Sequence, residues 1–110
     1  MLVIDSDTVK AEKVQTEGAK DTTIQILINH PPAPTFVMRK FRIKPGGYTP
    51  LHAHDYEHEV YVLEGLGEVG DKQQSIPIKQ GSVVFIPPNE VHQFRNVGEG
   101  DLVFLCLVPA

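Results

Sequence analysis

Four histidines carry the clearest chemical signal in this sequence. His52, His54 and His58 fall within seven positions, and His92 stands in a second stretch, Gly81 to Asn96. The first three share one parity, so in extended chain their side chains point to one face. Neutral imidazole binds Zn, Cu, Fe and Ni well and Mn acceptably. Four imidazoles directed at one place therefore predict a site for a divalent transition metal.

A plainer interpretation is that these histidines are exposed side chains on edge strands. That interpretation would suffice for one pair such as His52 and His54, but it does not explain a fourth histidine framed by glycine and proline. His30 is the contrast case, because it stands in the proline-rich connection His30 to Pro34. We expect His30 to be solvated and to have no role in the site.

The spacing of the first three histidines also predicts a change of direction. On one straight strand His54 and His58 would lie about 13 Å apart, at roughly 3.3 Å per residue, too far to share an ion. We therefore expect a bend at Asp55 to Glu57, with His52 and His54 on one limb of a hairpin and His58 on the other. His92 can reach them only if the sheet curls.

The rest of the chain supplies short strands that suit such a curled sheet. Residues 22–29 and 35–44 alternate between apolar and polar side chains, and the sequence Pro45-Gly46-Gly47 is typical of a tight turn. Several further short strands follow, separated by glycine, proline and asparagine, and the last is LVFLCLV (102–108). No helical apolar period is sustained, so the pattern predicts an all-β sandwich or barrel.

Parity also indicates which other side chains face the predicted site. Phe94 shares the face of His92, and Phe104 and Cys106 share one face of the closing strand. Arg39 is a charge on the otherwise apolar face of its strand. Arg39 would either clamp an anionic substrate or form an internal salt bridge. Cys106 is either a small buried apolar residue or a participant in the chemistry.

Composition excludes several classes of function. The chain has 110 residues with a formal charge of −4, which disfavours nonspecific binding to nucleic acid. The longest apolar run has only seven residues, and no signal-peptide pattern is present, so we expect neither membrane insertion nor secretion. One cysteine cannot form an internal disulfide, which is compatible with a cytoplasmic location. The expected partner is a small molecule.

Two motifs resemble those of the cupin superfamily. The first, G(x)5HxH(x)3-4E(x)6G, aligns with Gly46, His52 and His54, and the second, G(x)5PxG(x)2H(x)3N, with Gly81, Pro87, His92 and Asn96. The resemblance covers about residues 35 to 108. It implies a small single-domain barrel, the double-stranded β-helix or jelly roll, formed by residues 22–110.

The chain departs from these motifs at two positions. Asn89 replaces a glycine, and asparagine is the residue other than glycine that most readily adopts a left-handed backbone. His58 stands where the family usually has a glutamate ligand, while Glu59 has the parity that points away. We therefore predict the ligand set His52, His54, His58 and His92, similar to the small four-histidine cupins that bind manganese.

The resemblance also implies a homodimer, with the arm of residues 1–21 pairing with the partner's sheet. It implies one divalent metal per subunit, with Mn preferred and Fe, Ni, Co, Cu or Zn possible. The leading function is a Mn(II)- or Fe(II)-dependent oxidoreductase of dioxygenase type, acting on a small anionic or enolisable molecule. Arg39, Phe94, Phe104 and Cys106 are the expected substrate-binding residues, and no catalytic residue is assigned. The alternatives are a metal-dependent decarboxylase or isomerase, or a binding protein without turnover.

Overall fold

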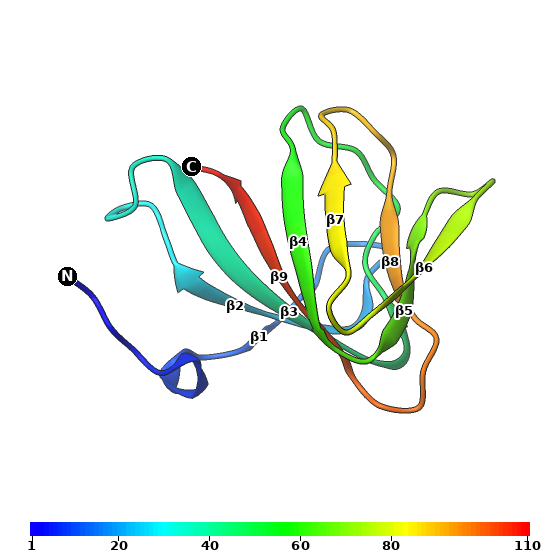
Figure 1. The fold of residues 1–110 in the computed structure, drawn as a ribbon, viewed down its shortest axis with the longest axis horizontal. Coiled ribbons are helices and arrows are strands. Elements are labelled where there is room, and N and C mark those ends of the chain that lie inside the picture. The colour runs from blue at the N-terminus through cyan, green and yellow to red at the C-terminus, as the bar shows by residue number, and fades with distance from the viewer.

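The computed structural model describes all 110 residues as a curled antiparallel sheet. One short 3-10 helix, η1, precedes nine strands (Figure 1). The bounds of the elements are η1 Ser6–Thr8, β1 Glu12–Lys13, β2 Lys20–Ile28, β3 Phe36–Tyr48, β4 His58–Glu64, β5 Leu66–Gly70, β6 Ser75–Lys79, β7 Val83–Ile86, β8 Gln93–Asn96 and β9 Leu102–Pro109. The prediction of an all-β fold is confirmed, and no helix is long or apolar enough to span a membrane.

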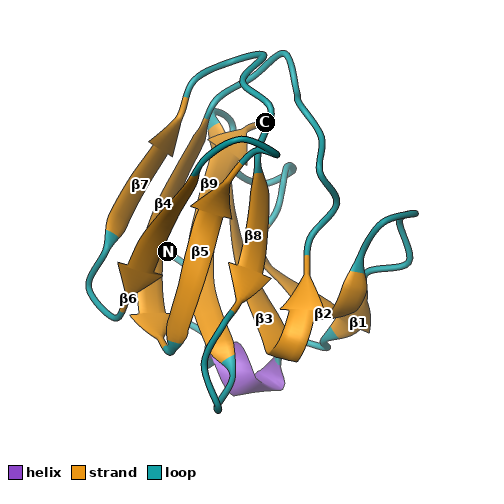
Figure 2. Cartoon of the chain, turned by 90° about the vertical axis from the view of Figure 1, so that its right-hand side faces the viewer, coloured by secondary structure: helices purple, strands orange, loops and turns teal.

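The long strand β3 joins the two halves of the sheet. The order of hydrogen-bonded strands is β6-β5-β8-β3-β9-β4-β7, with β2 on β3 and β1 on β2. The first part of β3 pairs with β9 from Phe36 opposite Pro109 to Ile43 opposite Leu102, and its end reaches β8 through Tyr48 opposite Arg95. The sheet curls between these two partners, so β8 faces β9 and β4 across the interior (Figure 2).

Alternating side chains of the strands fill the interior. In β4, His58, Val60 and Val62 are buried while Glu59 and Tyr61 are exposed. This alternation is the pattern of a sheet with one face toward the core and the other toward water. The core cluster has twelve buried residues, namely Val37, Ile43, Val60, Val62, Val69, Ile78, Ile86, Phe94, Leu102, Phe104, Cys106 and Val108.

The tight turn expected at Pro45-Gly46-Gly47 is wrong, because β3 runs through it to Tyr48. The pairing with β2 instead slips there, from Thr22 opposite Ile43 to Lys20 opposite Tyr48. Gly46 has a positive φ of 81°, and a Cβ on Gly47 would lie 2.6 Å from the carbonyl oxygen of Lys20. The two glycines therefore make a bulge in a continuing strand.

The N-terminal arm lies against its own chain. β1 pairs with β2, with Glu12 opposite Ile24, and the Gln25 side chain donates hydrogen bonds to the carbonyl oxygens of Ser6 and Val9. The boundary expected at residue 21 falls just inside β2, which begins at Lys20. Pairing of the arm with a partner subunit concerns a second copy of the chain and stays a prediction.

Candidate metal centre

The four histidines come from three parts of the sheet. His52 and His54 lie in the extended segment between β3 and β4, His58 opens β4, and His92 directly precedes β8. His52 and His92 form an antiparallel bridge, in which each backbone N–H donates to the other residue's carbonyl, at N···O distances of 3.1 and 2.9 Å. The curl of the sheet therefore brings His92 beside His52, as the sequence predicts.

The expected hairpin between the limbs of His54 and His58 is wrong in one respect. The chain does bend, at residues 55 and 56, and the rings of His54 and His58 lie 5.2 Å apart between centroids. However, β4 pairs with β7 and β9, not with the segment of His52 and His54. That segment is held by His92 and by the backbone N–H of Asn89, which donates to the carbonyl of His54 at 2.6 Å.

The imidazole rings converge closely enough to share one ion. The ligand atoms of His52, His54 and His92 lie within 4.8 Å of one another, and Nε2 of His52 is 3.2 Å from Nε2 of His54. The ring centroid of His58 is 4.9 Å from that of His92. This donor set, made of imidazoles alone, fits a divalent transition metal. It does not determine which metal binds.

One backbone contact fixes the tautomer of His92. Its Nδ1 lies 2.9 Å from the carbonyl oxygen of Glu90, and a carbonyl can only accept a hydrogen bond. Nδ1 therefore carries the proton, which leaves the lone pair of Nε2 free. Metal-binding histidines are usually oriented by such a contact at the second ring nitrogen.

His58 is the most telling of the four because one of its nitrogens has no partner. The residue is only 5% exposed, and its Nδ1 lies 3.4 Å from Sγ of Cys106. Its Nε2 is one of two buried side-chain nitrogen or oxygen atoms in the chain without a hydrogen bond; the other is Nε of Arg39. Buried polar atoms are nearly always paired, so an orphaned imidazole nitrogen beside three other imidazoles fits a metal ligand. His58 lies outside the tight group of three, and its role as fourth ligand stays a prediction.

The surroundings favour the neutral form of His52, His54 and His58. Burial lowers the pKa of His52 and of His58 to about 4, and the neighbouring histidines and Arg39 add to the effect. The pKa of His54 is lowered by the same kind of causes, chiefly burial. Metals bind imidazole only in its unprotonated form, so three rings are ready to bind a cation at neutral pH.

A cavity of about 440 Å³ opens beside the histidines. The four residues expected to bind substrate, Arg39, Phe94, Phe104 and Cys106, all lie in its wall. The lining contains no aspartate and no glutamate, although it contains Arg39 and Lys13. With or without a bound cation, this cavity therefore favours anionic ligands.

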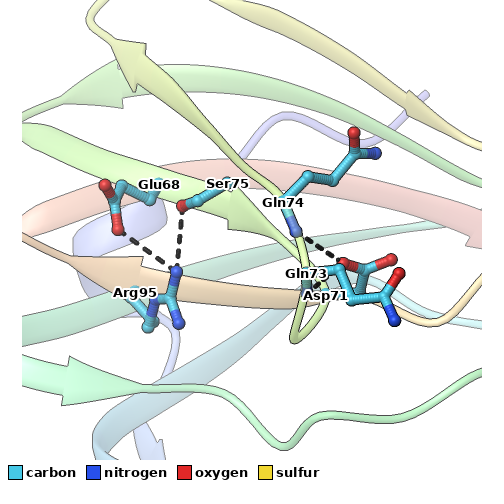
Figure 3. A network of polar contacts seen from close by, with 6 residues as sticks. All are labelled: Glu68, Asp71, Gln73, Gln74, Ser75 and Arg95. Carbon is cyan, nitrogen blue, oxygen red and sulfur yellow. Dashed lines mark hydrogen bonds and ion pairs between the residues drawn. The ribbon is translucent and has the colours of Figure 1, made fainter.

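Arg39 has no carboxylate partner, so the expected alternative of an internal salt bridge is wrong. Its Nη2 donates to Sγ of Cys106 at 3.1 Å, and its Cζ lies 5.1 Å from the centre of the Phe41 ring. The ion pairs of the chain belong to two other arginines, Arg42 with Asp101 and Arg95 with Glu68. Figure 3 shows the second pair, in which Arg95 also donates to Ser75 and no residue of the cavity takes part.

Sequence reasoning missed several residues of the cavity. Phe41 stacks on Phe104 at 5.4 Å between ring centroids, and Phe104 stacks on Phe94 at 4.6 Å, so three phenylalanines form one wall. Phe41 lies two residues after Arg39 on the same strand, so the alternation of side chains could have placed it on the same face. Residues 13–16 of the arm also line the cavity, and no pattern in the sequence indicates this contact. His30 is exposed and lies outside the cavity, in accord with the expectation.

The sheet of this chain is curled and antiparallel, and it directs histidines into a cavity. These features place the chain among small β-barrel proteins with a candidate metal site. Residues 39–108 match the family model described as a cupin domain. The chain therefore belongs to the cupin family. The expected jelly-roll fold is confirmed by solved structures of cupins with the same fold.

Two solved structures show how close the likeness is. The polyketide cyclase RemF from Streptomyces resistomycificus is 38% identical with a TM-score of 0.92, and the match covers 99% of this chain and 79% of that one. A predicted oxalate decarboxylase from Thermotoga maritima is 28% identical with a TM-score of 0.87, and the match covers 98% of both chains.

Curated relatives match over a shorter range. The oxalate-binding protein of Thermotoga maritima is 37% identical over 70 residues, which cover 63% of this chain and 58% of that protein. The 1-methylthio-D-xylulose 5-phosphate methylsulfurylase of Rhodospirillum rubrum is 34% identical over 73 residues, or 66% of this chain and 47% of that protein. The chain thus spans about half the length of the curated relatives it matches.

Proposed function

We propose that this cupin is a metal-dependent enzyme that binds a small enolisable carbonyl compound as its enolate. The observation that carries the proposal is the cavity itself, which joins four histidines and one unpaired arginine to a wall of three phenylalanines. The lining contains no carboxylate, so the positive charges of Arg39 and of a bound cation must be balanced by a negative charge on the ligand. An anion with a planar conjugated body satisfies both features.

The residues of the chain have separate tasks in this proposal. The histidines hold the ion, with Mn(II) or Fe(II) preferred, and an ion bound there supplies Lewis acidity that stabilises an enolate oxygen. Arg39 pairs with a second oxygen of the substrate and so fixes its orientation. Phe41, Phe94 and Phe104 exclude water and pack against the conjugated body.

Two reactions use such an enolate, and the first needs no oxidant. In an intramolecular aldol closure, a proton passes from the carbon between two carbonyls to solvent, and the freed electron pair forms a C–C bond to another carbonyl carbon of the same molecule. The alkoxide produced takes up a proton, so the ring product is an isomer of the substrate. The likeness to the polyketide cyclase RemF, over almost the whole chain, supports this cyclase type of reaction.

The second candidate is the dioxygenase type of reaction. Here dioxygen is the co-reactant, a C–C bond of the enolate is broken, and both oxygen atoms end in the products. The observation that favours it is the apolar wall of Phe94 and Phe104 beside an all-imidazole site, which leaves room for a small apolar molecule such as dioxygen.

A β-diketone probe tests the proposal and separates the two reactions. Protein loaded with Mn(II) or Fe(II) is mixed with an aryl β-diketone in D₂O, and exchange of the central C–H is followed by NMR without oxygen. We expect faster exchange than with metal-free protein, and slower exchange for Arg39→Leu than for the control Arg42→Leu. No acceleration by the metal-loaded protein would overturn the proposal.

The same mixture is then exposed to air, and oxygen uptake is measured together with products by mass spectrometry. Exchange or ring closure without uptake supports the cyclase type. Metal-dependent uptake with cleaved products supports the dioxygenase type. Binding of the diketone with neither exchange nor uptake means that the protein is a binding module.

A further inference from the structure

Sγ of Cys106 joins the two side chains of the cavity that have an orphaned nitrogen. On β9, Cys106 lies between its neighbours Arg39 on β3 and Val60 on β4. Its sulfur is 3.1 Å from Nη2 of Arg39 and 3.4 Å from Nδ1 of His58. The buried side-chain nitrogen and oxygen atoms without a hydrogen-bond partner are Nε of Arg39 and Nε2 of His58. One sulfur atom therefore holds both residues while leaving one nitrogen of each unused.

The direction of the two hydrogen bonds follows from the donors present. A guanidinium has no acceptor, so Arg39 donates to the sulfur. Towards His58 two arrangements exist: either Nδ1–H donates to the sulfur, or the thiol S–H donates to Nδ1. In the second arrangement the proton of the neutral ring sits on Nε2, where it has no acceptor in a buried position. Orphaned buried N–H donors are rarer than unpaired acceptors, which favours the first arrangement.

We infer that Cys106 is a positioning residue, whose sulfur accepts from both Arg39 and His58 and so keeps the lone pair of His58 Nε2 toward the cavity. The carbonyl of Glu90 does the same for His92. A carboxylate at position 106 would also orient both side chains, but its charge would neutralise Arg39. A thiol positions the two groups and adds no negative charge to a cavity wall that contains no carboxylate.

This inference concerns the protein without substrate and stands independently of the reaction proposed above. It is tested first on the unmutated chain of 110 residues, freed of metal and labelled with ¹⁵N in the histidine rings. Long-range ¹H–¹⁵N correlation spectra at neutral pH show which ring nitrogen carries the proton. We expect the proton of His58 on Nδ1. A proton on Nε2 of His58 would overturn the inference. His92 is the internal reference, because its Nδ1–H is fixed by a backbone carbonyl.

Substitution of Cys106 then separates positioning from packing. Cys106→Ala removes the acceptor, and we expect His58 to lose its single tautomer and the affinity for Zn(II) or Mn(II) to fall by about 10- to 100-fold. Cys106→Ser keeps an acceptor and is expected to retain both properties. Val108→Ala truncates another buried residue of β9 and is the control for lost packing.

Two results of this series would contradict the inference. One is an unchanged His58 tautomer in Cys106→Ala, and the other is a loss of affinity in Val108→Ala as large as in Cys106→Ala. If the alanine variant does not fold, the spectrum of the unmutated chain and that of Cys106→Ser still decide between the two arrangements. Loss of turnover with a correct His58 tautomer would count against the proposed function and leave the inference intact.

Discussion

The chemistry of this site depends on which nitrogen of each histidine is free. In His92 the Nδ1–H donates a hydrogen bond to a backbone carbonyl, and in His52 and His54 the two Nε2 atoms approach to 3.2 Å. His58 presents a buried Nε2 without a partner. The ligand atoms of His52, His54 and His92 lie close enough to hold a cation, with His58 as the expected fourth ligand, and the cavity wall contains no carboxylate to compensate its charge.

The assignment of His58 as fourth ligand leads to a direct prediction. His58→Ala is expected to lower metal affinity by at least about tenfold, because even loss of a group that only supports a ligand costs that much. Glu59→Ala is the matched control, since Glu59 is the next residue on β4 and its side chain is exposed. Metal content of both variants after purification, measured by elemental analysis, checks the prediction. Equal retention in the two would remove His58 from the ligand set.

The pH dependence of stability follows from the lowered pKa values. In the folded chain the pKa of His52 and of His58 is about 4, whereas in the unfolded chain it returns to about 6.5. Between these values the unfolded chain binds more protons, so the free energy of unfolding decreases as pH falls. We expect the Tm of the metal-free protein to be level above about pH 7 and to fall between about pH 6.5 and 4.

Thermal melts at stepped pH measure this effect, and replacing both residues by glutamine should flatten the slope. A Tm that rises on acidification through this window would contradict the prediction. A histidine with an ordinary pKa of about 6.5 would begin to lose a bound metal near that pH. With His52 and His58 neutral down to about pH 4, we expect the metal to be retained further into the acid range.

At the residue scale the sequence predicts much of the site. Shared parity brings His52 and His54 to one face, and parity also finds Arg39, Phe94, Phe104 and Cys106, all in the cavity wall. The alternation of side chains along a strand does not predict which contacts orient these groups. The link from Arg39 through Cys106 to His58 joins β3, β9 and β4, and such distant pairings have no local signature in the sequence.

At the scale of elements, the loop between β7 and β8 does the most to position the ligands. It contains Asn89 with a φ of 68°, whose N–H donates to the carbonyl of His54, and it ends at His92. The left-handed backbone that the sequence predicts for Asn89 is confirmed. One short loop thus fixes the backbone of two predicted ligands.

Substitutions at this position test the role of the loop. Asn89→Ala is expected to lower the free energy of unfolding by about 1–2 kcal/mol, because a Cβ without a side-chain acceptor is strained at positive φ. Asn89→Gly is expected to change it by less than about 0.5 kcal/mol, since glycine adopts this backbone freely and the side chain is exposed. Urea unfolding measures both. Similar losses in the two variants would show that the asparagine side chain, not the backbone, is what matters.

Element boundaries were harder to predict where glycine and proline allow two outcomes. Pro45-Gly46-Gly47 has the composition of a reverse turn, yet β3 pairs with β2 on both sides of it and with β8 at Tyr48, so the strand stays extended and the glycines form a bulge. The shared face of Phe104 and Cys106 on β9, by contrast, was predicted correctly, because both side chains are buried. The local sequence therefore predicts strands well. It predicts turns only where pairing with a neighbouring strand does not keep the chain extended.

At the scale of the molecule, the single chain leaves apolar surface without a cover. The N-terminal arm projects at the end of the long axis opposite β5 and β6 (Figure 1). Its residues Leu2, Val3 and Ile4 are exposed, and Ile26 and Ile28 of β2 are 43% and 38% exposed. Together with Leu27 and Met38, most of these residues border a groove of about 280 Å³. An apolar groove at the edge of a sheet is a natural contact for a second copy.

We expect the chain to form a homodimer through this surface, with the arm of one subunit against the other. Ile26→Ser combined with Ile28→Ser should shift the protein toward monomer, as should deletion of residues 1–10, because both remove apolar area from the contact. Val83→Ser with Phe85→Ser is the matched control, since these β7 residues are also exposed and apolar but lie on another part of the sheet. Sedimentation velocity at micromolar concentration measures the outcome. A monomeric parent chain would contradict the homodimer, and dissociation only in the β7 variant would place the contact elsewhere. Either result would leave the arm as a wall of its own cavity.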